Sequence, residues 1–292
     1  MKDAFVKPTY KRQRFLLSFI HQLDENVTVT DIQKLAFLHT MSGESNYYEF
    51  IPYKFGAYSF QLGEDLDILA KNGYITVDNL QRGKRIKAVA EYSDTYSYQI
   101  ASERGNALIR RSYREYPYYT IKSEITERLF DGEELDFFYR IKQSYVKTEQ
   151  ALFTIGYEGK SIEYFINCLI KNDIRLLCDI RKNPLSRKFG FSKSKLKHVT
   201  QTIGIKYVHI PELGIESDKR NSLRTKEDYR NLFVEYENSL KSRKIFLDDI
   251  YNLIQQNDRV ALMCFELDPE MCHRHVVRDY IINNYNIRSV DI

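Results

Sequence analysis

A thiol and a carboxylate stand two positions apart at Cys264 and Glu266, where an apolar run that begins at Val260 ends. A cysteine becomes a nucleophile when nearby cations or helix amides lower the pKa of its thiol. A glutamate in such a place can act as a general acid or base, or can orient a basic side chain. Cys264 and Glu266 are therefore the candidate catalytic residues. Two alternatives stay open: Cys264 could simply end a core strand, and Glu266 could form a structural salt bridge.

Polar side chains return a few residues later, at Cys272, His273, Arg274 and His275. We expect them on a helix that begins near Pro269, whose free amides would favour an anion. Neighbouring residues of a helix point about 100° apart, and structural zinc sites usually contain CxxC pairs, which this sequence lacks. The spacing therefore predicts no metal ion. We therefore expect Cys272, His273 and Arg274 either to bind an acidic substrate or to hold the walls of a crevice in place.

The strongest local charge lies between Arg181 and Thr200, where seven Lys and Arg residues occur without any Asp or Glu. Arginine binds phosphate through a planar fork, and aromatic rings offer stacking faces to unpaired bases. The segment could instead be a solvated basic loop, and its aromatic side chains could belong to a core. The residues expected to bind a substrate or an anion are Tyr157, Glu158, Asp179, Arg181, Ser186, Arg187, Cys272, His273 and Arg274.

From Ala151 onward, apolar strands alternate with helices, which is typical of a parallel sheet covered on both faces. In such sheets the functional crevice lies beyond the carboxyl ends of the strands, so we expect the polar residues after each strand to converge there. The fold class predicted for this half is α/β, with a mainly parallel sheet and flanking helices. The predicted strands are 152–155, 175–180, 206–209 and 260–265, and the predicted helices are 161–171, 192–203 and 229–255.

The first half of the chain has a different pattern. Helical spacing predicts helices over 11–22, 30–38 and 57–72, with Thr30 as the cap of the second. A strand at 74–77 follows, and then a strand pair at 86–90 and 96–100. Three helices followed by a hairpin is the order of a winged helix, an α+β fold.

The third predicted helix would have to enter the DNA groove, yet it is rich in acidic residues. Glu64, Asp65 and Asp67 occupy its outer positions, and phosphates would repel them. The module could therefore serve dimerisation or the docking of a protein partner instead. Contact with the DNA backbone stays open, through the basic residues Lys34, Lys54, Arg82, Lys84 and Arg85.

Length and composition suit two domains, since the chain has 292 residues, 43% of them hydrophobic and 29% charged. We expect a winged-helix-like domain over 1–120, a helical linker over 121–150 and an α/β domain over 151–292. No stretch approaches the roughly 20 apolar residues of a membrane span, and the N-terminal sequence is not typical of a secretory signal. We therefore expect a cytoplasmic protein with reduced cysteines and no membrane partner.

Four separated motifs stand in order in the second half: 154–159, 179–181 with 183–187, 204–207 leading to 213–214, and 264–266 with 272–274. Together they resemble the bacterial and archaeal family called domain of unknown function 488. The resemblance implies an α/β domain over about 151–285, in a family often suspected of acting on nucleic acids. In the first half, residues 54–59 and the helix after them are similar to prokaryotic antitoxin-associated helix-turn-helix domains.

Two main classes of function follow from these features. The first is an enzyme of unspecified reaction that acts on nucleic acid or a nucleotide-like phosphate compound, with Cys264 and Glu266 near the chemistry. The second is a non-catalytic DNA-binding regulator whose α/β crevice senses a small anionic ligand. The N-terminal resemblance adds a third hypothesis, a partner-binding component of a toxin-antitoxin or phage-defence system. The partners to test are DNA, RNA, another protein and a second copy of the chain, and the sequence specifies no cofactor.

Overall fold

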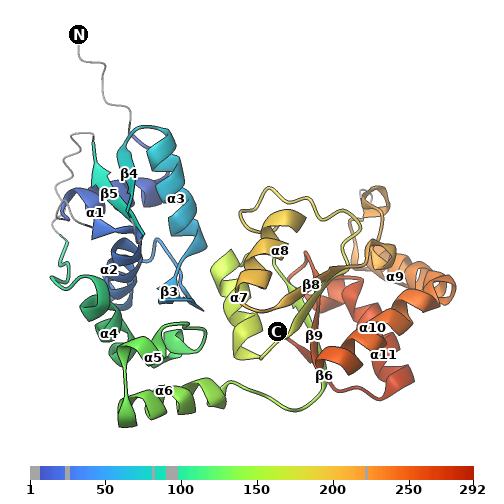
Figure 1. The fold of residues 1–292 in the computed structure, drawn as a ribbon. Coiled ribbons are helices and arrows are strands. Elements are labelled where there is room, and N and C mark those ends of the chain that lie inside the picture. Colours follow the sequence, from blue (N-terminus) through green and yellow to red (C-terminus); the bar gives the residue numbers. More distant parts are fainter. Residues whose placement is uncertain (1–6, 24–26, 81–82, 90–97, 221–222) are drawn as a thin grey trace. The chain divides into compact units, whose positions relative to one another are not determined.

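In the computed structural model, the described residues are 7–23, 27–80, 83–89, 98–220 and 223–292 (Figure 1). The chain divides into two compact units, residues 1–144 and 145–292, and each unit has a hydrophobic core of its own. None of the helices in the described segments has the length and the apolar character that crossing a membrane requires.

The first unit begins with helices and short strands that enclose one core. These elements are α1 (Lys11–His21), β1 (Val27–Thr28), α2 (Val29–Met41), β2 (Ile51–Tyr53), β3 (Gly56–Tyr58), α3 (Phe60–Lys71), β4 (Ile75–Asn79) and β5 (Lys84–Ala88). Strands β1, β5 and β4 form an antiparallel sheet in that order. The cap of α2 is Thr28 rather than the predicted Thr30, because Thr28 and Asp31 exchange hydrogen bonds between side chain and backbone in a capping box.

The hairpin of the first unit lies earlier in the chain than the sequence pattern predicts. Strand β4 pairs with β5 in antiparallel register, with Ile75 opposite Ala88 and Asn79 opposite Lys84. The predicted partner strand at 96–100 is not formed over the described residues 98–100, and 90–97 lie outside the described residues. The segment predicted as a single strand at 74–77 is therefore one arm of the hairpin.

The acidic side chains of α3 do not all point outward as expected. Asp65 is fully buried, and its carboxylate accepts hydrogen bonds from Arg12 Nε at 2.7 Å, Gln13 Nε2 at 2.8 Å and the Tyr48 hydroxyl at 3.0 Å. Helical spacing places Asp65 on the same face as Leu62 and its other apolar neighbours. Asp65 therefore fastens α3 to α1 and is not part of an acidic outer face.

The region predicted as a linker is packed into the first unit. It contains α5 (Thr126–Leu129) and α6 (Gly132–Ser144), which follow α4 (Gly105–Glu115). Phe130 and Phe138 from this region share a buried cluster with Ile109 and Tyr113 of α4. Residues 121–144 thus belong to the first unit, because their apolar side chains are needed to cover α4.

The second unit is built on a five-stranded sheet whose strands are parallel throughout, as predicted. Its elements are β6 (Ala151–Gly156), α7 (Ile162–Lys171), β7 (Leu176–Asp179), α8 (Lys193–Thr202), β8 (Lys206–His209), α9 (Lys226–Leu240), α10 (Lys244–Asn257), β9 (Arg259–Cys264), α11 (Arg274–Tyr285) and β10 (Ser289–Asp291). The strand order is β10-β6-β9-β7-β8, so β9 is central. Every residue of β9 is buried, as expected for a strand covered on both faces.

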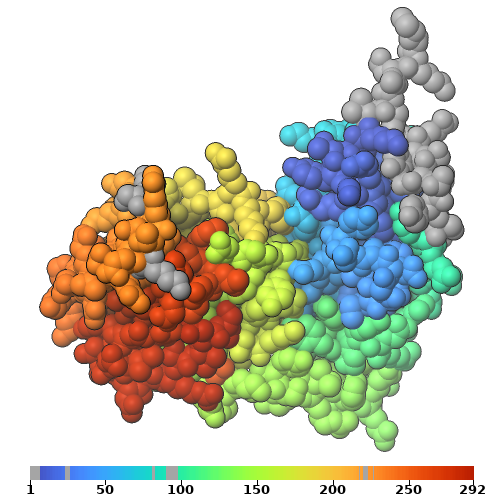
Figure 2. Space-filling model, turned by 180° about the vertical axis from the view of Figure 1, so that it is seen from behind, coloured from blue at the N-terminus to red at the C-terminus, as the bar shows by residue number. Residues whose placement is uncertain are grey.

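Helices cover both faces of this sheet, with α7 and α8 on one side and α9, α10 and α11 on the other (Figure 1). Along β7, Leu176 and Cys178 point to one face of the sheet and Leu177 to the other. Leu176 and Cys178 pack in the hydrophobic cluster that includes residues of α9, α10 and α11. The surface of these three helices forms one continuous region, orange to red in Figure 2.

Two elements of the second unit differ from the predicted pattern. The helix expected over 229–255 is interrupted, because a short 3-10 turn, Lys241–Arg243, separates α9 from α10. Strand β10 has no counterpart in the prediction. It pairs with β6 at the sheet edge through Ser289–Asp291 only, which is too short for a periodic signal.

Candidate functional site

The carboxyl ends of four neighbouring strands bring the candidate residues to one edge of the parallel sheet. In the sheet register, Gly156 lies opposite Cys264, while Asp179 lies opposite both Met263 and His209. The loops that follow β6, β9, β7 and β8 therefore start side by side. This is the convergence that the strand-end argument predicts.

A compact cluster forms around the end of β9. The Cys264 sulfur lies 3.3 Å from Glu266 Oε2 and 3.7 Å from His273 Nδ1, and the Cys272 sulfur lies 3.9 Å from the same nitrogen. Cys264, Cys272 and His273 are buried, whereas Glu266 is half-buried. Burial, reinforced by the neighbouring Cys264 and Glu266, raises the pKa of Cys272 above its ordinary value.

A hydrogen bond made by the second ring nitrogen fixes the orientation of the His273 ring. His273 Nε2 lies 3.2 Å from the carbonyl oxygen of Ile180, which can only accept a hydrogen bond. Nε2 therefore carries the proton, and in the neutral ring the lone pair of Nδ1 faces the sulfurs of Cys264 and Cys272. The thiols and the imidazole are thus arranged around one point.

The backbone near Cys272 explains why the sequence did not predict this cluster. A 3-10 turn, Pro269–Met271, ends at Cys272, whose backbone is extended with φ −136° and ψ 135°, and α11 begins only at Arg274. The predicted continuous helix from Pro269 is therefore broken. The 100° separation of helical neighbours does not apply to Cys272 and His273, and their side chains can face the same point.

Arg274 holds the loop after β9 instead of presenting its charge to a substrate. Its side chain is 1% exposed, and it donates hydrogen bonds to the carbonyl oxygens of Glu266 at 2.5 Å and Leu267 at 2.9 Å and to the Thr154 hydroxyl at 3.2 Å. A Cβ atom on Gly156 would meet the Glu266 carbonyl oxygen at 1.7 Å, so the loop also depends on a glycine at this position. Arg274 thus has a structural role in this loop, and its expected role in anion binding stays a prediction.

Arg181 is likewise occupied by the protein itself. Its guanidinium binds the Asp179 carboxylate through two hydrogen bonds of 2.8 and 2.6 Å, and a third nitrogen donates to the Tyr157 hydroxyl and the Phe191 carbonyl. Burial opposes the charged form, but the hydrogen bonds and charge of Asp179 outweigh it and raise the pKa of Arg181. The Tyr207 hydroxyl donates to the same carboxylate at 2.7 Å. Arg181 and Asp179 therefore form a buried structural pair.

The aromatic rings near this pair are part of the core. Tyr157 and Phe191 stack with ring centroids 4.4 Å apart, and both are buried. Each of these two rings therefore covers a face of the other that an unpaired base would need.

The basic segment after β7 carries the remaining anion-binding candidates. Arg187 is exposed, whereas Ser186 and Lys188 are half-buried and linked by a hydrogen bond from the Lys188 amide to the Ser186 hydroxyl. Lys188 Nζ also donates to the carbonyl of Tyr157 at 3.2 Å. Glu158 is exposed, and its carboxylate accepts a hydrogen bond from the Leu267 amide at 3.0 Å. Arg187 is thus the predicted guanidinium of this site that the structure leaves at the surface.

The basic residues proposed for DNA contact in the first unit have different environments. Lys34 is 2% exposed, and its ammonium donates to the Ala57 carbonyl at 2.5 Å, so it is not available to a phosphate. Burial lowers the pKa of Lys34 to about 7. Lys54 lies 3.3 Å from the Glu124 carboxylate. In β5, Lys84 is exposed and Arg85 half-buried, and Arg82 lies outside the described residues.

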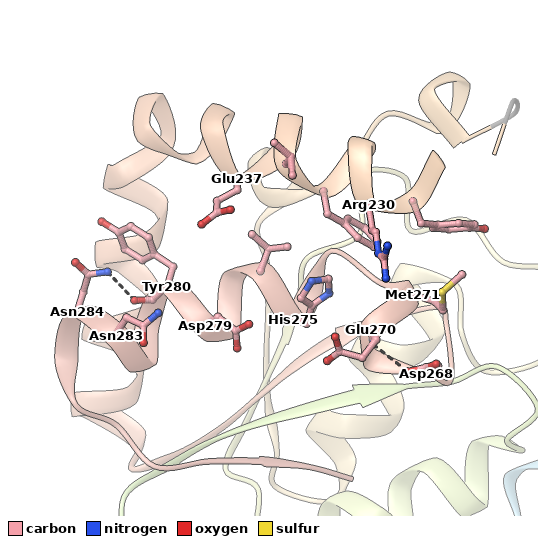
Figure 3. A pocket seen from close by; sticks show the side chains of 14 residues that line it. Arg230, Glu237, Asp268, Glu270, Met271, His275, Asp279, Tyr280, Asn283 and Asn284 are labelled. Carbon is pink, nitrogen blue, oxygen red and sulfur yellow. Dashed lines mark hydrogen bonds between the residues drawn. The ribbon is translucent and has the colours of Figure 1, made fainter. Parts of the chain in front are cut away.

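A pocket of about 700 Å³ lies between α9 and α11, beside the cluster at Cys272 (Figure 3). Sequence reasoning missed it. Its lining includes the carboxylates of Glu237, Asp268, Glu270 and Asp279 together with Arg230, so its charge does not suit a phosphate. The acidic residues after β9 were a signal in the sequence for one wall of this pocket. The opposite wall comes from α9, which is too distant in the chain for the sequence to show that the two walls face each other. The full lining is Tyr229, Arg230, Phe233, Val234, Glu237, Asp268, Glu270, Met271, His275, Val276, Asp279, Tyr280, Asn283 and Asn284.

Comparison with known families is consistent with three of the four motifs of the second unit, whereas the first motif, 154–159, precedes the matched residues. Residues 161–281 match the family model described as Domain of unknown function DUF488. The DUF488 match starts at the cap of α7 and ends in α11, so it includes Arg181, Cys264 and the segment 272–274. The searches of curated proteins and of solved structures gave no match. The similarity to DUF488 supports the family resemblance of the C-terminal unit and indicates no reaction.

Proposed function

We propose that the second unit is an enzyme that acts on nucleic acid or on a nucleotide-like phosphate compound. The observation that carries the proposal is the 3.3 Å contact between the Cys264 thiol and the Glu266 carboxylate at the carboxyl end of the central strand. A carboxylate that accepts a hydrogen bond from a thiol at the edge of a parallel sheet is suited to proton transfer. The basic segment that follows the adjacent strand β7 has the charge that a phosphate requires.

Within this proposal, Glu266 exchanges the proton with the substrate. Its side chain is half-buried and so reaches the solvent side of the cluster, whereas Cys264 is only 2% exposed. Cys264 donates to Glu266 and fixes the carboxylate, and it is a positioning residue in this respect. The assignment places the chemistry on the carboxylate rather than on a thiolate nucleophile.

The phosphate contacts belong to the exposed part of the basic segment. Arg181 and Arg274 direct their donors to groups of the protein, so they cannot also form a fork around a substrate anion. Arg187 is exposed, and Lys188 lies against the loop after β6 through the Tyr157 carbonyl. Arg187 and Lys188 are therefore the cations assigned to the substrate.

Substrate conversion by the Glu266→Gln variant tests this proposal. The full chain is incubated with single- and double-stranded DNA and RNA oligonucleotides and with nucleoside phosphates, and products are identified by mass spectrometry. The wild type is expected to convert at least one of them, and Glu266→Gln to convert it about 100-fold more slowly, the usual loss for a general acid or base. Glu270→Gln, an exposed carboxylate nearby, serves as the control. Equal rates for wild type and Glu266→Gln would remove Glu266 from the chemistry.

A second proposal concerns the first unit, as a winged-helix-like module that contacts the nucleic-acid backbone through its hairpin. It is favoured by the order of helices and strands and by the exposed Lys84 on β5. Because cations on a backbone release counterions, affinity for a DNA duplex should fall with salt, and Lys84→Ala should lower the slope of log affinity against log salt by about one. Binding measured by fluorescence anisotropy that is independent of salt would contradict this role and favour a protein partner.

A further inference from the structure

We propose that Cys264, Cys272 and His273 bind one divalent transition-metal ion, zinc by preference, with Glu266 beside the fourth coordination position. The three ligand atoms are the two sulfurs and His273 Nδ1, and they all lie within 4.8 Å of one another. The proposal goes beyond the proposed function, because metal binding does not depend on any substrate.

The two distances between sulfur and nitrogen ligand atoms agree with tetrahedral coordination. With zinc–sulfur bonds of about 2.3 Å and zinc–nitrogen bonds of about 2.0 Å, a sulfur and a nitrogen ligand lie roughly 3.6 Å apart. The observed distances from His273 Nδ1 are 3.7 Å to the Cys264 sulfur and 3.9 Å to the Cys272 sulfur. Each sulfur is therefore at a distance from His273 Nδ1 at which both atoms can bind the same ion.

The histidine is oriented as a metal ligand usually is. Metal-bound imidazoles commonly donate their other ring N–H to a carbonyl or a carboxylate, which fixes the tautomer and the ring plane. His273 Nε2 meets the Ile180 carbonyl at 3.2 Å, so the Nδ1 lone pair points to the two sulfurs. This contact comes from the end of β7 and is independent of the two cysteines.

The charge and chemistry of the ligands select the kind of ion. Binding displaces the thiol protons of Cys264 and Cys272, so the hydrogen bond from Cys264 to Glu266 belongs to the metal-free chain, and the two thiolates then neutralise a divalent cation inside a buried site. Thiolate and imidazole ligands suit zinc, whereas magnesium and calcium require oxygen ligands. The set of two cysteines and one histidine thus favours zinc among the common divalent ions.

Glu266 lies on the more exposed side of the site. Its Oε2 atom lies 3.3 Å from the Cys264 sulfur, and the side chain is half-buried while the three ligands are buried. Three protein ligands with a fourth position available to water or substrate is the arrangement of catalytic zinc sites, whereas structural sites are closed by four. The role of Glu266 next to the ion rests on the proposed function, but the metal site does not.

Metal content of the purified full chain tests the proposal first. Zinc is measured by inductively coupled plasma mass spectrometry after purification without a metal-affinity tag. We expect about one ion per chain in the wild type and more than about tenfold less in Cys272→Ala, since loss of a thiolate removes most of the affinity. Cys178→Ala is the matched control, because Cys178 is a buried thiol on the adjacent strand β7. Equal zinc in the Cys272→Ala and control proteins would overturn the proposal.

A cobalt titration of the wild type gives an answer even where Cys272→Ala does not fold. Co²⁺ bound here is expected to show the intense visible bands of tetrahedral cobalt and a near-ultraviolet thiolate charge-transfer band, both saturating at one equivalent. Absence of the charge-transfer band would overturn the site. Glu266→Gln should keep the cobalt spectrum while losing turnover. The metal site and the proposed function can thus fail separately.

Discussion

The buried arginines of the second unit form their ion pairs and hydrogen bonds with groups of the protein itself. Arg181 is paired with Asp179, and Arg274 is bonded to the carbonyls of Glu266 and Leu267. Their positions after strand ends were predictable from the sequence. Their partners were not, because a backbone carbonyl leaves no signal in the residue pattern. Arg181 and Arg274 therefore hold the chain after β7 and β9 in place.

Removing Arg181 should be costly for this reason. Arg181→Ala leaves the Asp179 carboxylate, which is fully buried, without its cation, and breaking such a pair typically costs about 3–5 kcal/mol. The free energy of unfolding, measured with urea, is expected to fall by this amount. Arg187→Ala, at an exposed position, should change it by less than about 0.5 kcal/mol. Equal stabilities of the two variants would show that the pair has no structural role.

Because of Lys34, we expect the free energy of unfolding of the first unit to increase as the pH rises. Its pKa is about 7 in the folded chain, whereas the pKa of an unperturbed lysine is 10.5, so between these values the unfolded chain binds more protons. The free energy of unfolding must therefore rise with pH across this window, by an amount on the order of a few kcal/mol. Urea unfolding of Lys34→Met should lack this rise and show greater stability near pH 7. A variant with the same pH dependence as wild type would contradict the burial of a charged ammonium.

At the scale of elements, the buried strands of the second unit were predictable because their apolar runs are continuous. The loop at Cys272 was not, since helix-forming residues surround it and only the tertiary contacts of the cluster explain its extended backbone. The proximity of Cys264 to Cys272 and His273 could not be predicted for a similar reason. It requires the chain to turn back after β9, which local spacing does not encode.

Gly156 tests how strictly the strand ends are packed. A Cβ atom here would lie 1.7 Å from the Glu266 carbonyl oxygen, so Gly156→Ala must displace the loop that carries Glu266. We expect a clear loss of thermal stability, of about 1–3 kcal/mol for overpacking, together with weaker cobalt binding. Gly159→Asn is the control, because Gly159 has a φ of 73°, which asparagine tolerates, and open space around it. A Gly156→Ala protein as stable as this control would show that the loop can move away freely.

At the scale of the whole molecule, the change of periodicity near residue 150 predicted two differently built halves, and the chain does divide after Ser144. The region 121–144 illustrates what composition cannot decide. The sequence predicted helices here but assigned them to a linker, whereas Phe130 and Phe138 complete the core around Tyr113. The pocket between α9 and α11 has an acidic lining, so its volume of about 700 Å³ does not by itself mark a phosphate site.

Strand β9 and the segment before α11 bring two sulfurs and one imidazole nitrogen around a single point. X-ray absorption spectroscopy of the zinc-loaded full chain measures this arrangement directly. We predict a first shell with two sulfur atoms at about 2.3 Å and one imidazole nitrogen at about 2.0 Å. A shell made only of oxygen and nitrogen atoms would contradict it.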